Sequence, residues 1–205
     1  ESIARLLAGV RQAVEERDLL VVFTADHGES LGEHDYWGHG RNLFDPALRI
    51  PLGITWKDRI PPATVASQAN LIDVAPTVLG LVGIPVPAEL PGANWAATAL
   101  GGKSAPERSL CYQAHRGAVH GGTHDSDKKR SKGLLSVGII EGGRKEILEL
   151  HPSTHLLFDL ASDPGELRNL AAVPPNVSDD LLACFGEVSE SLGALDRLAT
   201  QKLDP

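Results

Sequence analysis

The run Leu-Leu-Val-Val-Phe-Thr at residues 19–24 constrains the fold most, because it is apolar without alternation and rich in β-branched side chains. Such a run is typical of a strand buried on both faces, as in a parallel sheet. A polar, glycine-rich loop follows it at residues 25–49. In open α/β sheets, ligands bind just outside the carboxyl ends of the strands. The sequence therefore predicts a functional site in this loop.

The remaining pattern predicts two domains. Up to about residue 105, helical periodicity from residue 2 and at 70–83 alternates with the strand above and a second strand at 50–56. Later residues favour an antiparallel sheet, and a Glu-Gly-Gly-Arg hairpin signal at 141–144 joins two of its strands. An amphipathic helix capped by Ser178 closes the chain. We predict an α/β domain at 1–105 and a small α+β domain with an antiparallel sheet and helices at 106–205.

Composition excludes several classes of function. The chain has 19 basic and 27 acidic residues, which gives a net charge of −8. A chain this acidic is a poor candidate for binding nucleic acid or an anionic membrane surface. We find no apolar stretch near the roughly 18–20 residues of a membrane span. The two cysteines, Cys111 and Cys184, cannot form a disulfide scaffold, and we expect separate thiols.

Asp26 and His27 directly follow the first predicted strand. An adjacent carboxylate and imidazole are plausible metal ligands. The carboxylate suits hard ions such as Ca²⁺ or Mg²⁺, and the imidazole widens the choice to Mn²⁺ or Zn²⁺. Two ligands do not complete a site, and a solvated turn is the alternative interpretation of the pair. His34 and His39 are either further ligands or ordinary loop residues.

Several strings, in this order, resemble the sulfatases of the alkaline phosphatase superfamily. They are Thr-Ala-Asp-His-Gly-Glu at 24–29, Leu-Gly-Glu-His at 31–34, Trp-Gly-His-Gly-Arg at 37–41 and Leu-Arg-Ile-Pro-Leu at 48–52. Later Leu-Phe-Asp-Leu at 157–160, Asp-Pro-Gly-Glu at 163–166 and Asn-Leu at 169–170 resemble a C-terminal segment of that family, and Lys145 falls on its Lys-containing strand. The resemblance extends over almost the whole chain.

This resemblance implies a partial alkaline-phosphatase-like α/β sandwich followed by the small C-terminal domain. It implies that Asp26 is a metal ligand and that His27 is a second metal ligand or contacts the nucleophile region, with Ca²⁺ expected first and Mg²⁺, Mn²⁺ or Zn²⁺ as alternatives. His39 falls where many members have a lysine that touches the transferred sulfate or phosphate, so a catalytic role is implied for His39. A protonated imidazole can donate to an anionic ester oxygen in the same way.

The family reaction also needs a nucleophile, a Cys or Ser in a Cys/Ser-x-Pro-x-Arg motif in sulfatases, and neither cysteine here fits that motif. The chain contains no Met and starts with Glu1 inside a predicted helix. We therefore expect the C-terminal portion of a metal-dependent sulfatase, with the nucleophile and other ligands upstream. The isolated chain is expected to be inactive, and its first strand to lack a neighbour and to expose an edge that favours homo-oligomers.

The expected substrate is a small-molecule or glycan sulfate ester. Alternatives within the superfamily are a phosphodiesterase, a phosphonate monoester hydrolase or a phosphoglycerol transferase. A noncatalytic binding module is the alternative from another class. The resemblance alone favours a periplasmic, extracellular or lysosome-like compartment.

Overall fold

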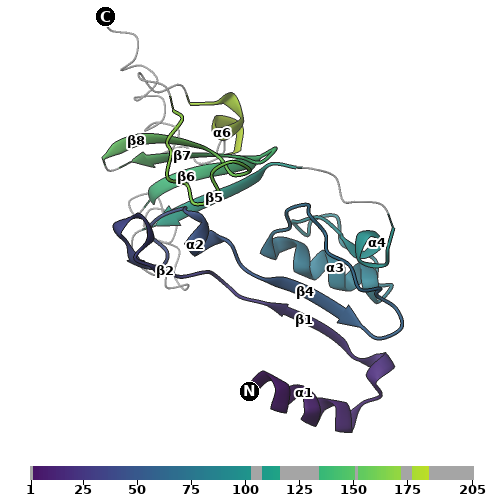
Figure 1. The fold of residues 1–205 in the computed structure, drawn as a ribbon. Helices are drawn as coiled ribbons and strands as arrows, with labels where there is room; N and C mark the ends of the chain where they lie inside the picture. The colour runs from purple at the N-terminus through teal and green to yellow at the C-terminus, as the bar shows by residue number, and fades with distance from the viewer. Residues whose placement is uncertain (1, 103–107, 116–133, 151, 172–176, 185–205) are drawn as a thin grey trace, which may run out of the picture. The chain divides into compact units, whose positions relative to one another are not determined.

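The computed structural model describes residues 2–102, 108–115, 134–150, 152–171 and 177–184 (Figure 1). Its contacts divide the chain into two compact units. The first comprises Glu1–Asp26 with Ile50–Glu107, and the second comprises His27–Arg49 with Arg108–Pro205. The loop after the first strand is thus grouped with the later residues. The expected domain boundary after residue 105 stays a prediction.

The first unit contains α1 (Ser2–Ala13), a 3₁₀ turn η1 (Glu16–Asp18), and a two-stranded sheet of β1 (Leu20–Thr24) and β4 (Leu52–Trp56). The strands are antiparallel, and Val22 lies opposite Ile54. No β1 residue is fully buried, and Phe23 is 49% exposed. The expectation that this strand is buried on both faces, as in a parallel sheet, is therefore wrong for the described chain. A two-stranded ribbon lacks the covering layers that such burial requires.

Three helical segments complete the described part of this unit: η3 (Leu71–Asp73), α3 (Val74–Leu81) and α4 (Ala96–Ala99). The expected helix near 70–83 is confirmed. Asp73 is 1% exposed, and its carboxylate accepts hydrogen bonds from the backbone N–H groups of Asn70 and Ala93 and from the Trp95 indole. Three donors compensate the burial of this carboxylate and join η3 to the loop before α4.

The second unit contains a four-stranded antiparallel sheet in the order β5-β6-β7-β8 (Figure 1). Its strands are β5 (Leu110–His115), β6 (Leu134–Glu141), β7 (Arg144–Leu150) and β8 (Ser153–Asp159). This confirms the predicted sheet. Gly142 and Gly143 have φ values of 53° and 79° between β6 and β7. Two consecutive positive φ values are what the tight hairpin turn needs, and glycine adopts them without steric cost.

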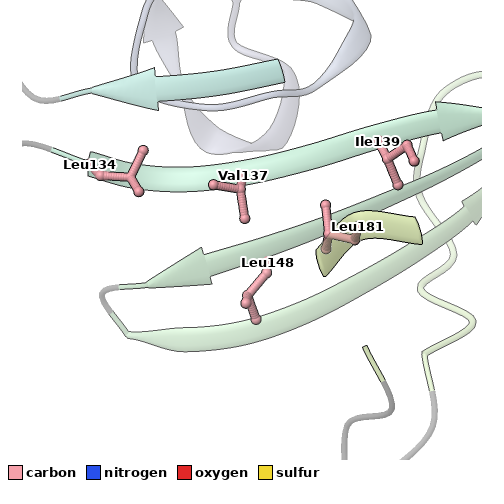
Figure 2. Packing of buried hydrophobic residues seen from close by; sticks show 5 residues of the cluster. All are labelled: Leu134, Val137, Ile139, Leu148 and Leu181. Carbon is pink, nitrogen blue, oxygen red and sulfur yellow. The ribbon is translucent and has the colours of Figure 1, made fainter. Parts of the chain in front are cut away.

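Both faces of this sheet are covered. Figure 2 shows Leu181 of α6 (Asp179–Cys184) directed at the same face as Leu148 of β7 and three residues of β6. On the opposite face, Leu43 packs with Ile147 of β7 and with Phe158 of β8. Side chains alternate between the faces of a strand, so Lys145 shares the face of Ile147, and Glu146 shares that of Leu148. This alternation places two buried ionisable residues of β7 on opposite sides of the sheet.

Glu146, on the α6 face, holds the start of that helix. Its carboxylate accepts hydrogen bonds from the Ser178 backbone N–H (2.9 Å) and hydroxyl, and pairs with His155 Nε2 at 2.7 Å. The Ser178 hydroxyl in turn accepts the backbone N–H of Leu181, which confirms the predicted N-cap. Burial alone would raise the pKa of Glu146, but the bonds from His155 and Ser178 outweigh it and lower the pKa.

Several sequence features fall partly or wholly outside the described residues. They include the basic run at 128–130 and the final helix beyond residue 184. Cys111, on β5, is disulfide-bonded, so the expectation of two separate thiols is wrong.

Within the described ranges, no helix combines the length and apolar character needed to cross a bilayer.

We predict that Glu146→Gln lowers the free energy of unfolding by about 1–3 kcal/mol, because a buried charged acceptor is lost. A carboxyl whose pKa is lowered by folding stabilises the protein above its unfolded pKa, and this contribution disappears as pH falls through the folded pKa. The loss of stability between about pH 7 and about pH 4 should therefore be smaller in Glu146→Gln than in the wild type. Urea unfolding at the two pH values measures it.

Glu149→Gln is the matched control on the same strand. Burial raises the pKa of Glu149, so its charged form opposes folding as pH rises. Its removal should leave stability at neutral pH unchanged or higher and should enlarge the loss on acidification. Equal effects of the two substitutions would contradict the assigned role of Glu146.

Candidate functional site

The loop after β1 is folded by short elements within His27–Arg49. Strands β2 (Ser30–Leu31) and β3 (Trp37–Gly38) pair antiparallel, with Ser30 opposite Gly38. The 3₁₀ turn η2 (Glu33–Asp35) connects them. This small ladder folds the chain back on itself, so that residues flanking β2 and β3 approach one another. Glu29 and His39, which are 10 positions apart in the sequence, thereby come into contact.

The connection between β2 and β3 uses left-handed backbone conformations. Gly32 has φ 118°, and the non-glycine residues His34 and Asp35 have φ values of 53° and 55°. The Glu33 carboxylate accepts the Leu31 backbone N–H at 2.6 Å. Backbone N–H groups directed at this carboxylate hold the pKa of Glu33 below its usual value. Left-handed non-glycine residues cost free energy, so the surroundings must stabilise this turn.

The ladder brings His27, Glu29 and His39 together. Their potential ligand atoms all lie within 4.8 Å of one another, and all three side chains are exposed. His39 Nδ1 lies 3.0 Å from Glu29 Oε2. The imidazole rings of His27 and His39 are stacked, with centroids 3.8 Å apart and planes inclined by 24°. Two imidazoles and a carboxylate at these distances can bind a divalent cation or orient an anionic ester.

The structure brings two of the residues expected in the site together. His27 and His39 are in the cluster, whereas Asp26 is not one of its three members. Asp26 has an exposed side chain and belongs to the first compact unit, and it immediately precedes His27 in the chain. Its role as a metal ligand stays a prediction. His34 stacks on Phe44, with ring centroids 3.7 Å apart, so this ring contributes to packing.

Sequence reasoning did not assign Glu29 a role. It stands two residues after His27 in the Thr-Ala-Asp-His-Gly-Glu string, but only the pairing of Ser30 with Gly38 brings it near His39. A second pattern lies later in the chain. Residues 104–108 read Ser-Ala-Pro-Glu-Arg and satisfy Ser-x-Pro-x-Arg. This string follows Asp26 and His27, whereas the expected family nucleophile precedes them, and residues 103–107 lie outside the described residues.

Gly28 fixes the position of the cluster through the one-turn helix α2 (Asp45–Leu48). The Gly28 N–H donates to the Ala47 carbonyl at 2.8 Å. A Cβ atom on Gly28 would lie only 2.1 Å from the Pro46 carbonyl oxygen. Only glycine permits this close approach without displacing one of the two backbones.

The comparisons with known proteins agree with the motifs of the loop. Residues 1–84 match the sulfatase family model. Arylsulfatase K of Xenopus laevis is 29% identical over 85% of this chain and 33% of its own length. The chain is thus similar to sulfatases over most of its length. It spans about a third of the length of the curated relatives it matches.

Two solved structures show that this chain shares their fold. The protein BT4656, solved in complex with its substrate D-glucosamine-2-N,6-O-disulfate, matches 99% of this chain and 39% of its own with a TM-score of 0.63 and 22% identity. The phosphonate monoester hydrolase of Agrobacterium radiobacter matches 95% of this chain and 38% of its own with a TM-score of 0.65 and 24% identity. The expected alkaline-phosphatase-like fold class is confirmed.

We predict that Gly28→Ala lowers the free energy of unfolding by about 1–3 kcal/mol, because the added methyl group forces two backbones apart. It should also shift the imidazole NMR signals of His27 and His39, since these flank the displaced turn. Gly53→Ala is the control, because a Cβ there has no atom within 4 Å and would point into open space. A Gly28→Ala protein with wild-type stability and histidine signals would contradict this prediction.

Proposed function

We propose that this chain forms one side of the active site of a metal-dependent sulfuric ester hydrolase. The observation that carries the proposal is the cluster of His27, Glu29 and His39, which follows the strand in a chain that is similar to sulfatases. Clustered imidazoles and carboxylates are the groups from which enzymes build sites that bind cations and transfer protons to anionic esters.

The donor set fits a divalent cation. His27 and Glu29 supply an imidazole nitrogen and a carboxylate oxygen within 4.8 Å of each other, and Asp26 adds a carboxylate next in sequence. Imidazole donors favour Mn²⁺ or Zn²⁺ over Ca²⁺, which prefers oxygen ligands. We therefore propose Mn²⁺ or Zn²⁺ for these donors and keep Ca²⁺ as the alternative. A cation held there supplies positive charge that stabilises the charged ester during reaction.

Glu29 and His39 suit a proton-transfer role. The carboxylate of Glu29 contacts Nδ1 of His39 at 3.0 Å, so it fixes the orientation of the ring. Nε2 of His39 is then the ring atom that can donate to an ester oxygen or to the leaving oxygen. The same arrangement, in which a carboxylate orients a histidine, occurs in hydrolases with unrelated folds.

The complete enzyme needs further parts. We propose that the nucleophile and the remaining metal ligands come from residues outside these 205, so that the isolated chain is inactive. The disulfide at Cys111 supports an oxidising compartment, such as the periplasm, the extracellular space or the lysosome. A sulfated small molecule or glycan is the proposed substrate class, and a homo-oligomer stays a prediction.

A phosphonate monoester hydrolase is the second candidate. The shared fold with the Agrobacterium enzyme supports it, as does the ability of the same imidazole and metal chemistry to serve a phosphorus centre. The ratio of kcat/KM for an aryl sulfate to that for an aryl phosphonate separates the two. A ratio above one supports the sulfatase, and a ratio below one supports the phosphonate hydrolase.

In the complete enzyme that contains this chain, His39→Ala should reduce kcat for an aryl sulfate by about 10²–10⁴-fold, because a positioned proton donor is lost. His27→Ala should also weaken binding of Mn²⁺ or Zn²⁺, and chelation followed by metal return should abolish and restore activity. His115→Ala is the matched control, because it removes an imidazole on β5 outside the cluster. Steady-state kinetics and metal titration measure these effects.

Two outcomes would contradict the proposal. The first is turnover by the isolated 205-residue chain that disappears in Asp26→Ala. The second is loss of turnover in Ser104→Ala of the complete enzyme, which would place the nucleophile in residues 104–108. Metal binding without turnover of either ester class by the complete protein would instead support the noncatalytic binding module.

A further inference from the structure

Lys145 is the most deeply buried cation among the described residues. Its side chain is 1% exposed, and Nζ lies 2.8 Å from Asp45 Oδ1 and 2.6 Å from Glu166 Oε1. The side chain of Glu166 is fully buried, and that of Asp45 is 16% exposed. These three residues, hereafter the buried triad, join β7, α2 and the turn after β8. Removing one member of a buried ion pair leaves an uncompensated charge, so the three positions depend on one another.

Glu166 has a second contact with α2. Its Oε2 accepts the backbone N–H of Asp45 at 2.6 Å. This N–H belongs to the first turn of α2, where backbone donors have no partner within the helix. Glu166 therefore binds the ammonium group of Lys145, which also pairs with Asp45, and it binds the backbone N–H of Asp45. The start of α2 is held at two points.

The turn that carries Glu166 is built for this contact. Asp163 organises it, because its carboxylate accepts the backbone N–H groups of Leu167 and Arg168 at 3.1 and 2.8 Å. Asn169 attaches the turn to β8 through the Leu157 N–H at 3.0 Å. Glu166 itself has φ 55°, an unfavourable conformation for a residue with a side chain. The surrounding contacts hold this conformation, which directs the carboxylate at α2.

From α2 the connection continues to the site. The Ala47 carbonyl accepts the N–H of Gly28, and a Cβ atom on Gly28 would lie 2.1 Å from the Pro46 carbonyl oxygen. Gly28 stands between His27 and Glu29 in the chain. A displacement of α2 therefore moves both residues relative to His39. Every contact in this series lies within the second compact unit.

We infer that the buried triad of Asp45, Lys145 and Glu166 positions His27, Glu29 and His39 for ligand binding, acting through α2 and Gly28. The three are positioning residues and do not touch the ligand. The ligand-binding part of this inference rests on the proposed function, whereas the positioning part concerns the arrangement of the cluster alone. Lys145 and Glu166 both lie in the segments that resemble the sulfatases, and the triad gives both a physical role.

The test uses Asp45→Ala, which removes the side-chain contact of α2 with Lys145, leaves the backbone N–H of residue 45 on Glu166, and keeps Lys145 and Glu166 as a neutral buried pair. Co²⁺ is the probe, because its visible absorption reports imidazole ligation. We expect Asp45→Ala to weaken Co²⁺ binding about 10–100-fold, the range found when residues behind metal ligands are changed. It should also shift the imidazole NMR signals of His27 and His39. Asp45→Asn, which keeps an oxygen acceptor for Lys145, should restore part of both.

Glu146→Gln is the stability control, because it removes a buried carboxylate from the same strand on the face away from α2. It should leave Co²⁺ affinity and both histidine signals unchanged at a temperature where circular dichroism shows each variant folded. Wild-type histidine signals in folded Asp45→Ala would overturn the inference, as would equal shifts in Glu146→Gln. Absence of Co²⁺ binding in the wild type would count against the proposed metal site alone, because the histidine signals still test positioning.

Discussion

The buried ammonium group of Lys145 is the interaction on which the second unit depends. A lysine on an inner strand of a sheet covered on both faces cannot reach water, so its charge must be balanced inside the protein. The balancing carboxylates belong to Asp45 and Glu166, which lie far from Lys145 and from each other in sequence. The sheet can therefore form with a satisfied interior only when both segments are docked on it. The segment that contains Asp45, before the sheet, and the turn that contains Glu166, after it, must therefore both pack on the sheet.

The candidate site needs such support because its own elements are small. Two residue pairs form the ladder of β2 and β3, and a ladder of this size has little stability in water. Support comes from the Gly28–Ala47 hydrogen bond, from the stacking of His34 on Phe44, and from Leu43 in the core below. The exposed functional residues are thus held by buried neighbours a few positions away. Rigid support beneath exposed side chains is what a site needs if its groups are to be held in a fixed geometry.

Among the three residues of the cluster, Glu29 changes the chemical interpretation most. With His39 alone, the loop offers an imidazole of undefined orientation. With Glu29 at 3.0 Å, Nδ1 of the ring has a fixed partner. The stacked His27 ring adds a second nitrogen ligand beside the same carboxylate. This set contains two imidazoles and one carboxylate, and it moves the proposed metal from the Ca²⁺ implied by the family resemblance toward Mn²⁺ or Zn²⁺.

The sequence by itself determined the local elements and the resemblance to sulfatases. The β6–β7 hairpin follows from consecutive glycines, the start of α6 from the Ser178 cap, and the resemblance from ordered motifs around Asp26, His27 and His39. These signals are local, because backbone preference and side-chain periodicity act over a few residues. Only the tertiary structure decided that β1 pairs antiparallel with β4, that the His27–Arg49 segment packs with the C-terminal sheet, and that Glu29 meets His39. Those contacts arise from burial and charge balance between distant residues such as Lys145 and Asp45, which no local pattern encodes.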